Sequence, residues 1–152
     1  MINRILALFE GPDSVGFAKP DELQLAAAAL MVEAASLDGK FDTIERAKIA
    51  RLLTERFTLS DEEADTLIEE AVAAVGETSQ LYGFTRIVKD RYDAADRIRM
   101  IEMLWEVAFA DGQVDHFESN LIRRIGGLLF VSDLDRGLAK HRVMARLGIA
   151  SN

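Results

Sequence analysis

The sequence predicts an all-α domain of about eight helices that contains two copies of a helix-loop-helix unit. From residue 21 onward, apolar residues recur at steps of three and four, which is the spacing of an amphipathic helix. No stretch alternates apolar and polar residues for long enough to form a convincing strand. Both prolines lie within the first 20 residues, so no proline interrupts the later helices. A chain of 152 residues suits one domain.

The N-terminal region, residues 1–20, is predicted to be a short helix followed by a turn-rich connection. Pro12, Pro20, Gly11 and Gly16 fall close together there, and proline and glycine are the residues that most often mark turns. The apolar run at 5–9 is too short for a signal peptide or a membrane span. Residues 21–150 are predicted to form the main helical domain, and a cytoplasmic location is expected.

The later helices are placed by their apolar stripes and by residues that start or end helices. Ser60 with Glu63 forms a capping-box pattern, and Asp93, Asp115 and Ser132 are predicted N-caps. The predicted helices are 21–37, 42–57, 60–77, 80–92, 94–110, 115–130 and 132–148.

The same stripes predict which side chains are buried. Trp105 is expected to fill the core, and Val72, Leu134 and Leu138 are expected to face inward. Arg142 and Arg146 are expected to complement the negative end of the last helix.

The composition excludes several classes of ligand. With 18 basic and 26 acidic residues the net charge is −8, which repels polyphosphates, so neither nucleic acid nor an anionic membrane is expected as a partner. Cysteine is absent, which removes thiolate metal sites and thiol redox chemistry. No nucleophile with a matching base, phosphate loop or histidine pair is present, so the chain is not expected to be an enzyme.

The internal repeat is the most informative feature of the sequence. Residues 29–45 align with residues 102–118 at an offset of 73. The shared pattern is Glu-x-Ala-x-x-Asp-Gly-x-apolar-Asp-x-x-Glu. Downstream, Ile49 aligns with Ile122 and Leu52 with Ile125, so the repeat extends into the second helix of each unit.

This paired motif resembles the TerB-like (tellurite-resistance) family, and the resemblance covers roughly residues 23–147. It implies an all-helical domain with no established enzymatic activity. Similar domains occur in tellurite-resistance proteins and beside a J-domain in some membrane-bound co-chaperones. The resemblance also implies that the acidic cluster binds metal cations.

The acidic motif has two interpretations that the sequence leaves open. In the first, Gly39 and Gly112 end one helix, and an Asp and a Glu form a capping box on the next, worth about 1 kcal/mol per cap. In the second, the carboxylates hold a divalent cation such as Ca²⁺, Mg²⁺ or Mn²⁺, because converging carboxylates raise one another's pKa values unless a cation neutralises them. The candidate ligands are Glu33, Asp38, Asp42, Glu45, Glu106, Asp111, Asp115 and Glu118.

Asp38 and Asp111 favour the cation interpretation. They stand at the C-terminal end of their helices, where the helix dipole disfavours a negative charge by roughly 0.3–1 kcal/mol. Each loop also resembles the second half of an EF-hand. The earlier ligand positions are Ala34 and Ser36 in the first copy and equally unsuitable in the second, so a complete EF-hand is not expected. A site shared between the two loops is the remaining arrangement.

Two functions are therefore predicted. The first is a TerB-like cytoplasmic module that binds divalent cations and takes part in a tellurite or envelope stress response. The alternative is a co-chaperone-like module that binds a protein partner, with the acidic motifs acting only as caps and the acidic helix 60–77 as a docking surface. The sequence does not determine the oligomeric state.

Overall fold

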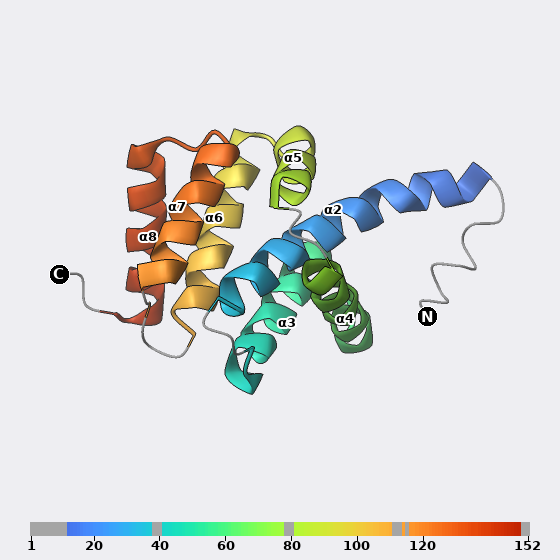
Figure 1. The fold of residues 1–152 in the computed structure, drawn as a ribbon, viewed down its shortest axis with the longest axis horizontal. Coiled ribbons are helices and arrows are strands. Elements are labelled where there is room, and N and C mark those ends of the chain that lie inside the picture. The colour runs from blue at the N-terminus through green and yellow to red at the C-terminus, as the bar shows by residue number, and fades with distance from the viewer. Residues whose placement is uncertain (1–11, 38–40, 78–80, 111–113, 115, 150–152) are drawn as a thin grey trace.

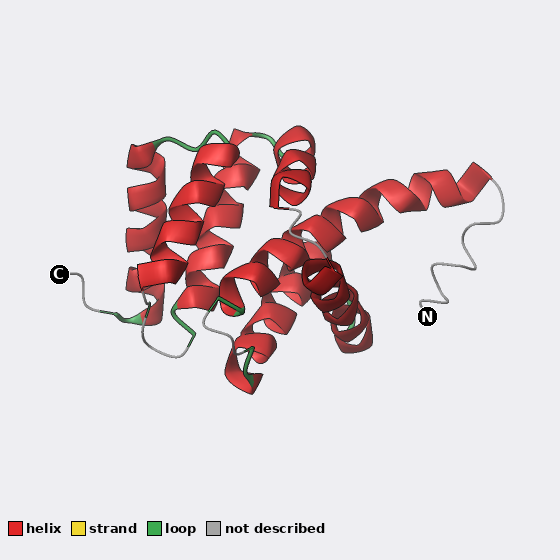
Figure 2. Cartoon of the chain, in the orientation of Figure 1, coloured by secondary structure: helices red, strands yellow, loops and turns green. Residues whose placement is uncertain are grey.

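The structure is a computed structural model that describes residues 12–37, 41–77, 81–110, 114 and 116–149. Across these ranges it contains seven α-helices and no strand (Figure 2), which confirms the all-α prediction. The short first helix that was predicted before Pro12 lies outside these ranges. The helices are α2 Pro12–Ala35, α3 Thr43–Phe57, α4 Asp61–Glu77, α5 Leu81–Arg91, α6 Ala94–Ala108, α7 His116–Leu128 and α8 Asp133–Leu147.

The N-terminal prediction is wrong for residues 12–20. The turn-rich connection is absent there, because α2 runs without a break from Pro12 to Ala35. Pro12 opens the helix, at a position where the missing N–H has no partner to lose. Pro20 lies inside the helix, which is uncommon because it removes one backbone hydrogen bond. Residues 12–20 therefore belong to the same helix as the start of the main domain.

Helix α2 is the central element of the fold. It packs against α3, α4, α5, α6 and α7, and Figure 1 shows its C-terminal half running between these helices while its N-terminal end projects away. The four alanines at 26–29 are completely buried, as are Leu30 and Met31. This half of the helix is buried all round, and the one-sided stripe that was predicted is wrong. Alanine suits the position because its small side chain lets several helices approach closely.

Helix ends follow the predicted capping residues. The Ser60 hydroxyl accepts a hydrogen bond from the Glu63 backbone N–H at 3.1 Å, and the Glu63 carboxylate accepts one from the Ser60 N–H at 2.9 Å. Asp93 and Ser132 cap α6 and α8, and each side chain accepts one hydrogen bond from the backbone N–H three residues later. Gly148 ends α8 with a left-handed φ of 71°. These predictions are confirmed, since local chemistry satisfies the free N–H groups of a helix start.

The repeat is also confirmed in three dimensions. Helices α2 and α6 end at Ala35 and Ala108, and α3 and α7 begin at Thr43 and His116, so both pairs are 73 residues apart (108 − 35 and 116 − 43). Aligned apolar positions are buried in both copies, for example Ile49 and Ile122, each at 0% exposure. The two units therefore present equivalent helix pairs around the two acidic loops.

Three of the predicted burials are wrong. Leu134 and Leu138 on α8 are 71% and 45% exposed, and Val72 on α4 is 38% exposed. Helix α8 packs mainly on α6, so Ala139 and Val143 are the buried residues of that helix. Trp105 is buried as predicted.

Candidate metal centre and the adjoining ion-pair cluster

Five of the eight predicted metal ligands lie in the part of the chain that the structure describes. They are Glu33, Asp42, Glu45, Glu106 and Glu118. Asp38, Asp111 and Asp115 lie outside the described residues, so their part in the site stays a prediction. In Figure 1 the C-terminal ends of α2 and α6, which lead into the two loops, both lie toward the lower side of the molecule.

Asp42 and Glu45 form the capping box at the start of α3. The Asp42 carboxylate accepts a hydrogen bond from the Glu45 N–H at 2.8 Å, and the Glu45 carboxylate accepts one from the Asp42 N–H at 3.3 Å. The capping interpretation is therefore confirmed for this pair. A carboxylate that caps a helix through one oxygen keeps further lone pairs that can bind a cation, so capping and metal binding are compatible here.

Glu45 and its repeat counterpart Glu118 are both buried, at 4% and 7% exposure. An acidic residue is seldom buried unless it is paired or hydrogen bonded. The same position is thus buried in both copies, which places these two carboxylates away from the outer surface.

Glu33 lies in the last turn of α2 and is partly buried. Burial raises the pKa of its carboxyl group above the ordinary value of 4.5. Within the described part of the chain, its side chain has no hydrogen bond and no ion pair. A carboxylate that is partly removed from water without a partner is destabilising when charged, and a bound cation would reverse that effect.

Glu106 stands at the equivalent position of the second repeat, but its environment is different. Its carboxylate lies 2.8 Å from Arg146 Nη2, 3.6 Å from Lys48 Nζ and 3.8 Å from Arg99 Nη1. These three cations neutralise it, as a metal ion would. The two repeats therefore share the spacing of their carboxylates and differ in what surrounds them.

Glu102 adds a second carboxylate to the ion pairs of Glu106, and the resulting ion-pair cluster was not predicted from the sequence. Glu102 lies one turn before Glu106 and receives hydrogen bonds from Arg142 Nε at 2.8 Å and Arg146 Nη1 at 3.0 Å. Arg99 adds a third contact at 3.2 Å. Burial alone would raise the pKa of Glu102, but the hydrogen bonds and charges of Arg142 and Arg146 outweigh it and lower the pKa.

Arg142 and Arg146 therefore do more than complement the dipole of α8, because they join α8 to α6. Two glutamates spaced by four residues on α6 face two arginines spaced by four on α8. Side chains four apart share a face of a helix. This matched spacing is the signal in the sequence that could have identified the cluster.

The two repeats contact each other at the last turn of α6. Lys48, one turn into α3, lies 3.6 Å from Glu106 on α6. The second helix of the first repeat therefore contacts the last turn of the first helix of the second repeat. Among the described residues, however, no group of three or more potential ligands lies close enough together to hold a metal ion. A complete cation site in this region therefore requires the loop aspartates as well as the described carboxylates.

Fold and site together define a helical module built from two helix-loop-helix units, each with an acidic loop. The family model described as tellurite resistance protein TerB matches residues 24–141. Since the match covers more than half of the chain, the protein belongs to the TerB family. No curated protein and no solved structure matches the chain. No helix in the described ranges is long and apolar enough to cross a membrane.

Proposed function

We propose that this chain is a cytoplasmic, non-enzymatic module that binds a divalent cation at its acidic loops and acts in a tellurite or envelope stress response. The observation that carries the proposal is Glu33, a partly buried carboxylate with a raised pKa and no partner among the described residues. Membership of a family named for tellurite resistance supports the stress role.

The first loop is the stronger half of the proposed site. There, Glu33 and the capping carboxylates Asp42 and Glu45 flank the loop that contains Asp38. Ca²⁺, Mg²⁺ and Mn²⁺ all prefer oxygen ligands of this kind. In the second repeat, Glu106 already has three cationic side chains near it. We therefore propose that Asp111, Asp115 and Glu118 contribute more to a shared site than Glu106 does.

The proposal predicts that divalent ions stabilise the protein through Glu33. In metal-stripped protein, an ion at 100 times its dissociation constant should add about 2.7 kcal/mol to the free energy of unfolding. For a domain of this size the increase in melting temperature is roughly 5–11 °C. The measurement is thermal unfolding followed by circular dichroism with Ca²⁺, Mg²⁺ or Mn²⁺. In Glu33→Gln and Asp38→Asn, the metal-dependent increase should largely disappear.

Without metal, Glu33→Gln should not lower the free energy of unfolding. Because the folded pKa of Glu33 is raised, the favourable protonated form is lost as pH rises from 4.5 through the folded value. At neutral pH the charged Glu33 carboxylate destabilises the folded state, so the metal-free variant should be at least as stable as the wild type. Glu55→Gln makes the same charge change on the exposed face of α3 and should keep the full metal response.

A wild type whose melting temperature is unchanged by millimolar Ca²⁺, Mg²⁺ and Mn²⁺ would refute cation binding. The acidic motifs would then act as caps only, and the module that binds a protein partner would stand in its place. Its proposed docking surface is α4, where Asp61 and Glu62 are exposed. Arg46 pairs with Asp65 at 3.3 Å and with Glu69 at 3.0 Å, so those two carboxylates are already engaged.

A further inference from the structure

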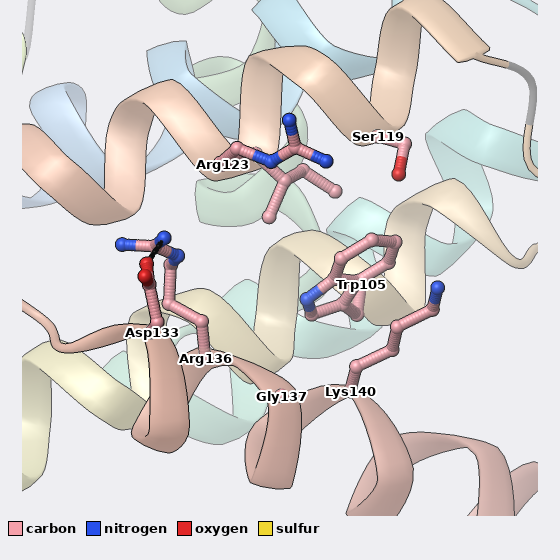
Figure 3. Close-up of a pocket in the computed structure, with 8 residues that line it drawn as sticks. Trp105, Ser119, Arg123, Asp133, Arg136, Gly137 and Lys140 are labelled. Carbon is pink, nitrogen blue, oxygen red and sulfur yellow. Dashed lines mark hydrogen bonds and ion pairs between the residues drawn. The ribbon is translucent and has the colours of Figure 1, made fainter.

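A cleft of about 460 Å³ lies between α7 and α8 and is lined by residues of α6, α7 and α8. Trp105 of α6 lies at its floor, and its rims carry Arg123 of α7 and Arg136 and Lys140 of α8 (Figure 3). Ile122 of α7 also lines it. None of these residues belongs to the proposed metal site. The volume falls within the range of about 300–1,000 Å³ that is usual for small-molecule sites.

The cleft is positively charged although the protein as a whole carries a charge of −8. Three cationic side chains border it, and the one carboxylate among its lining residues, Asp133, is paired with Arg136. Within the described residues, Arg123 and Lys140 have no carboxylate partner. A cleft with unpaired cations on both rims attracts anions, and arginine in particular suits phosphate and carboxylate groups.

Trp105 adds a directed hydrogen-bond donor to this charge. Its side chain is 6% exposed, and its Nε1 atom is buried with no hydrogen-bond partner among the described residues. In Figure 3 the indole nitrogen faces the space bordered by Arg123 and Arg136. Buried N–H groups nearly always have an acceptor. An oxygen of a bound anion would supply the acceptor that this one lacks.

Gly137 keeps the cleft open on the α8 side. It lies in the second turn of that helix, where glycine is an unfavourable residue. A Cβ at this position would meet no atom within 4 Å, so packing does not require glycine. A larger side chain at this position would extend over the cleft, and this offers a way to block it without disturbing the core.

We propose that this cleft binds a small molecule that carries a phosphate or carboxylate group on an apolar body. The anionic group lies between Arg123, Arg136 and Lys140 and accepts a hydrogen bond from the Trp105 indole N–H, and the apolar body occupies the rest of the cleft. Lys140 is held in place for this role, since its Nζ lies 4.8 Å from the centre of the Trp105 ring. The site is independent of the proposed cation site.

The test uses the only tryptophan of the chain, whose indole N–H gives a single signal in a ¹H–¹⁵N NMR spectrum. The intact protein is titrated with phenyl phosphate, with benzoate and with phenol as the uncharged analogue. A saturable shift of the indole signal with phenyl phosphate or with benzoate supports the proposal and identifies which anionic group is preferred. No shift with either, or an equal shift with phenol, overturns it.

Variants separate binding in the cleft from general attraction of anions. Arg123→Gln and Lys140→Gln should each weaken binding by about tenfold or more, as expected for loss of a charge-assisted contact. Arg124→Gln makes the same change one residue along α7, at an exposed position that does not line the cleft, and should bind as the wild type does.

Gly137→Leu should abolish binding while the melting temperature is maintained or raised, because leucine is the better helix former. Equal binding by Arg123→Gln and Arg124→Gln, or unchanged binding by Gly137→Leu, would also overturn the proposal.

Discussion

Replacement of Leu104 with alanine is expected to lower the free energy of unfolding by about 2–5 kcal/mol. Leu104 lies in α6 and is 0% exposed, in the helix that packs against α2, α7 and α8. Removing its isobutyl group loses the burial of apolar surface and leaves a cavity that rigid neighbouring helices fill only in part. Urea denaturation followed by circular dichroism measures the change.

Leu134→Ala is the matched control, because it makes the same substitution on a helix whose leucine is 71% exposed. It should change the free energy of unfolding by no more than about 0.5 kcal/mol. If both variants lost stability equally, the assignment of Leu134 to the surface would be contradicted, and with it the way α8 packs on α6.

The second large effect is expected from Glu102→Gln/Glu106→Gln, a double variant that removes the ion-pair cluster. Six ion pairs connect these carboxylates to Lys48, Arg99, Arg142 and Arg146. Side-chain exposure is about 10% for Glu102 and 7% for Glu106, but 48% for Arg142 and 42% for Arg146. The double variant should therefore lower the free energy of unfolding by about 2–4 kcal/mol. This is less than for a fully buried network, because the arginines that lose their partners can be hydrated again.

This cluster should also make the protein sensitive to acid. The pKa of Glu102 is lower in the folded chain than its ordinary value of 4.5. Its contribution to stability is complete above that ordinary value and is lost as pH falls through the lower, folded value. Between neutral pH and pH 3, the wild type should therefore lose more stability than the double variant.

Glu55→Gln/Glu62→Gln is the control for the cluster, since it removes two exposed charges that lie outside these ion pairs. It should retain the stability and the acid response of the wild type. A cluster variant that matched this control at every pH would show that the ion pairs contribute nothing to the fold.

Much of the fold could be predicted from the sequence because it depends on local chemistry. Ser60, Asp93 and Ser132 start helices through hydrogen bonds within a few residues, and such contacts are readable from spacing. The repeat offset of 73 likewise reappears in the helix ends. Membership of the TerB family follows from the same paired motif and is shown by the family match over residues 24–141.

The candidate site was predicted less completely, because equal spacing does not ensure equal surroundings. Glu33 and Glu106 occupy the same place in the two repeats, yet only Glu106 lies beside Arg146, Lys48 and Arg99. Those cations come from α3, α6 and α8, and no periodicity in the sequence shows that they meet. Equal spacing predicted equal roles for two carboxylates that have different neighbours in the folded chain.

The sequence by itself determined the helical class, the repeated unit, most helix starts and the family, since each depends on residues close together in the chain. Only the tertiary structure decided that α2 is buried on several sides, that Leu134 and Leu138 face outward, and that Trp105 lies beneath a cationic cleft. The physical reason is that burial and charge pairing depend on which helices pack together. That packing is set by the whole core, and a single helix carries only one side of each contact.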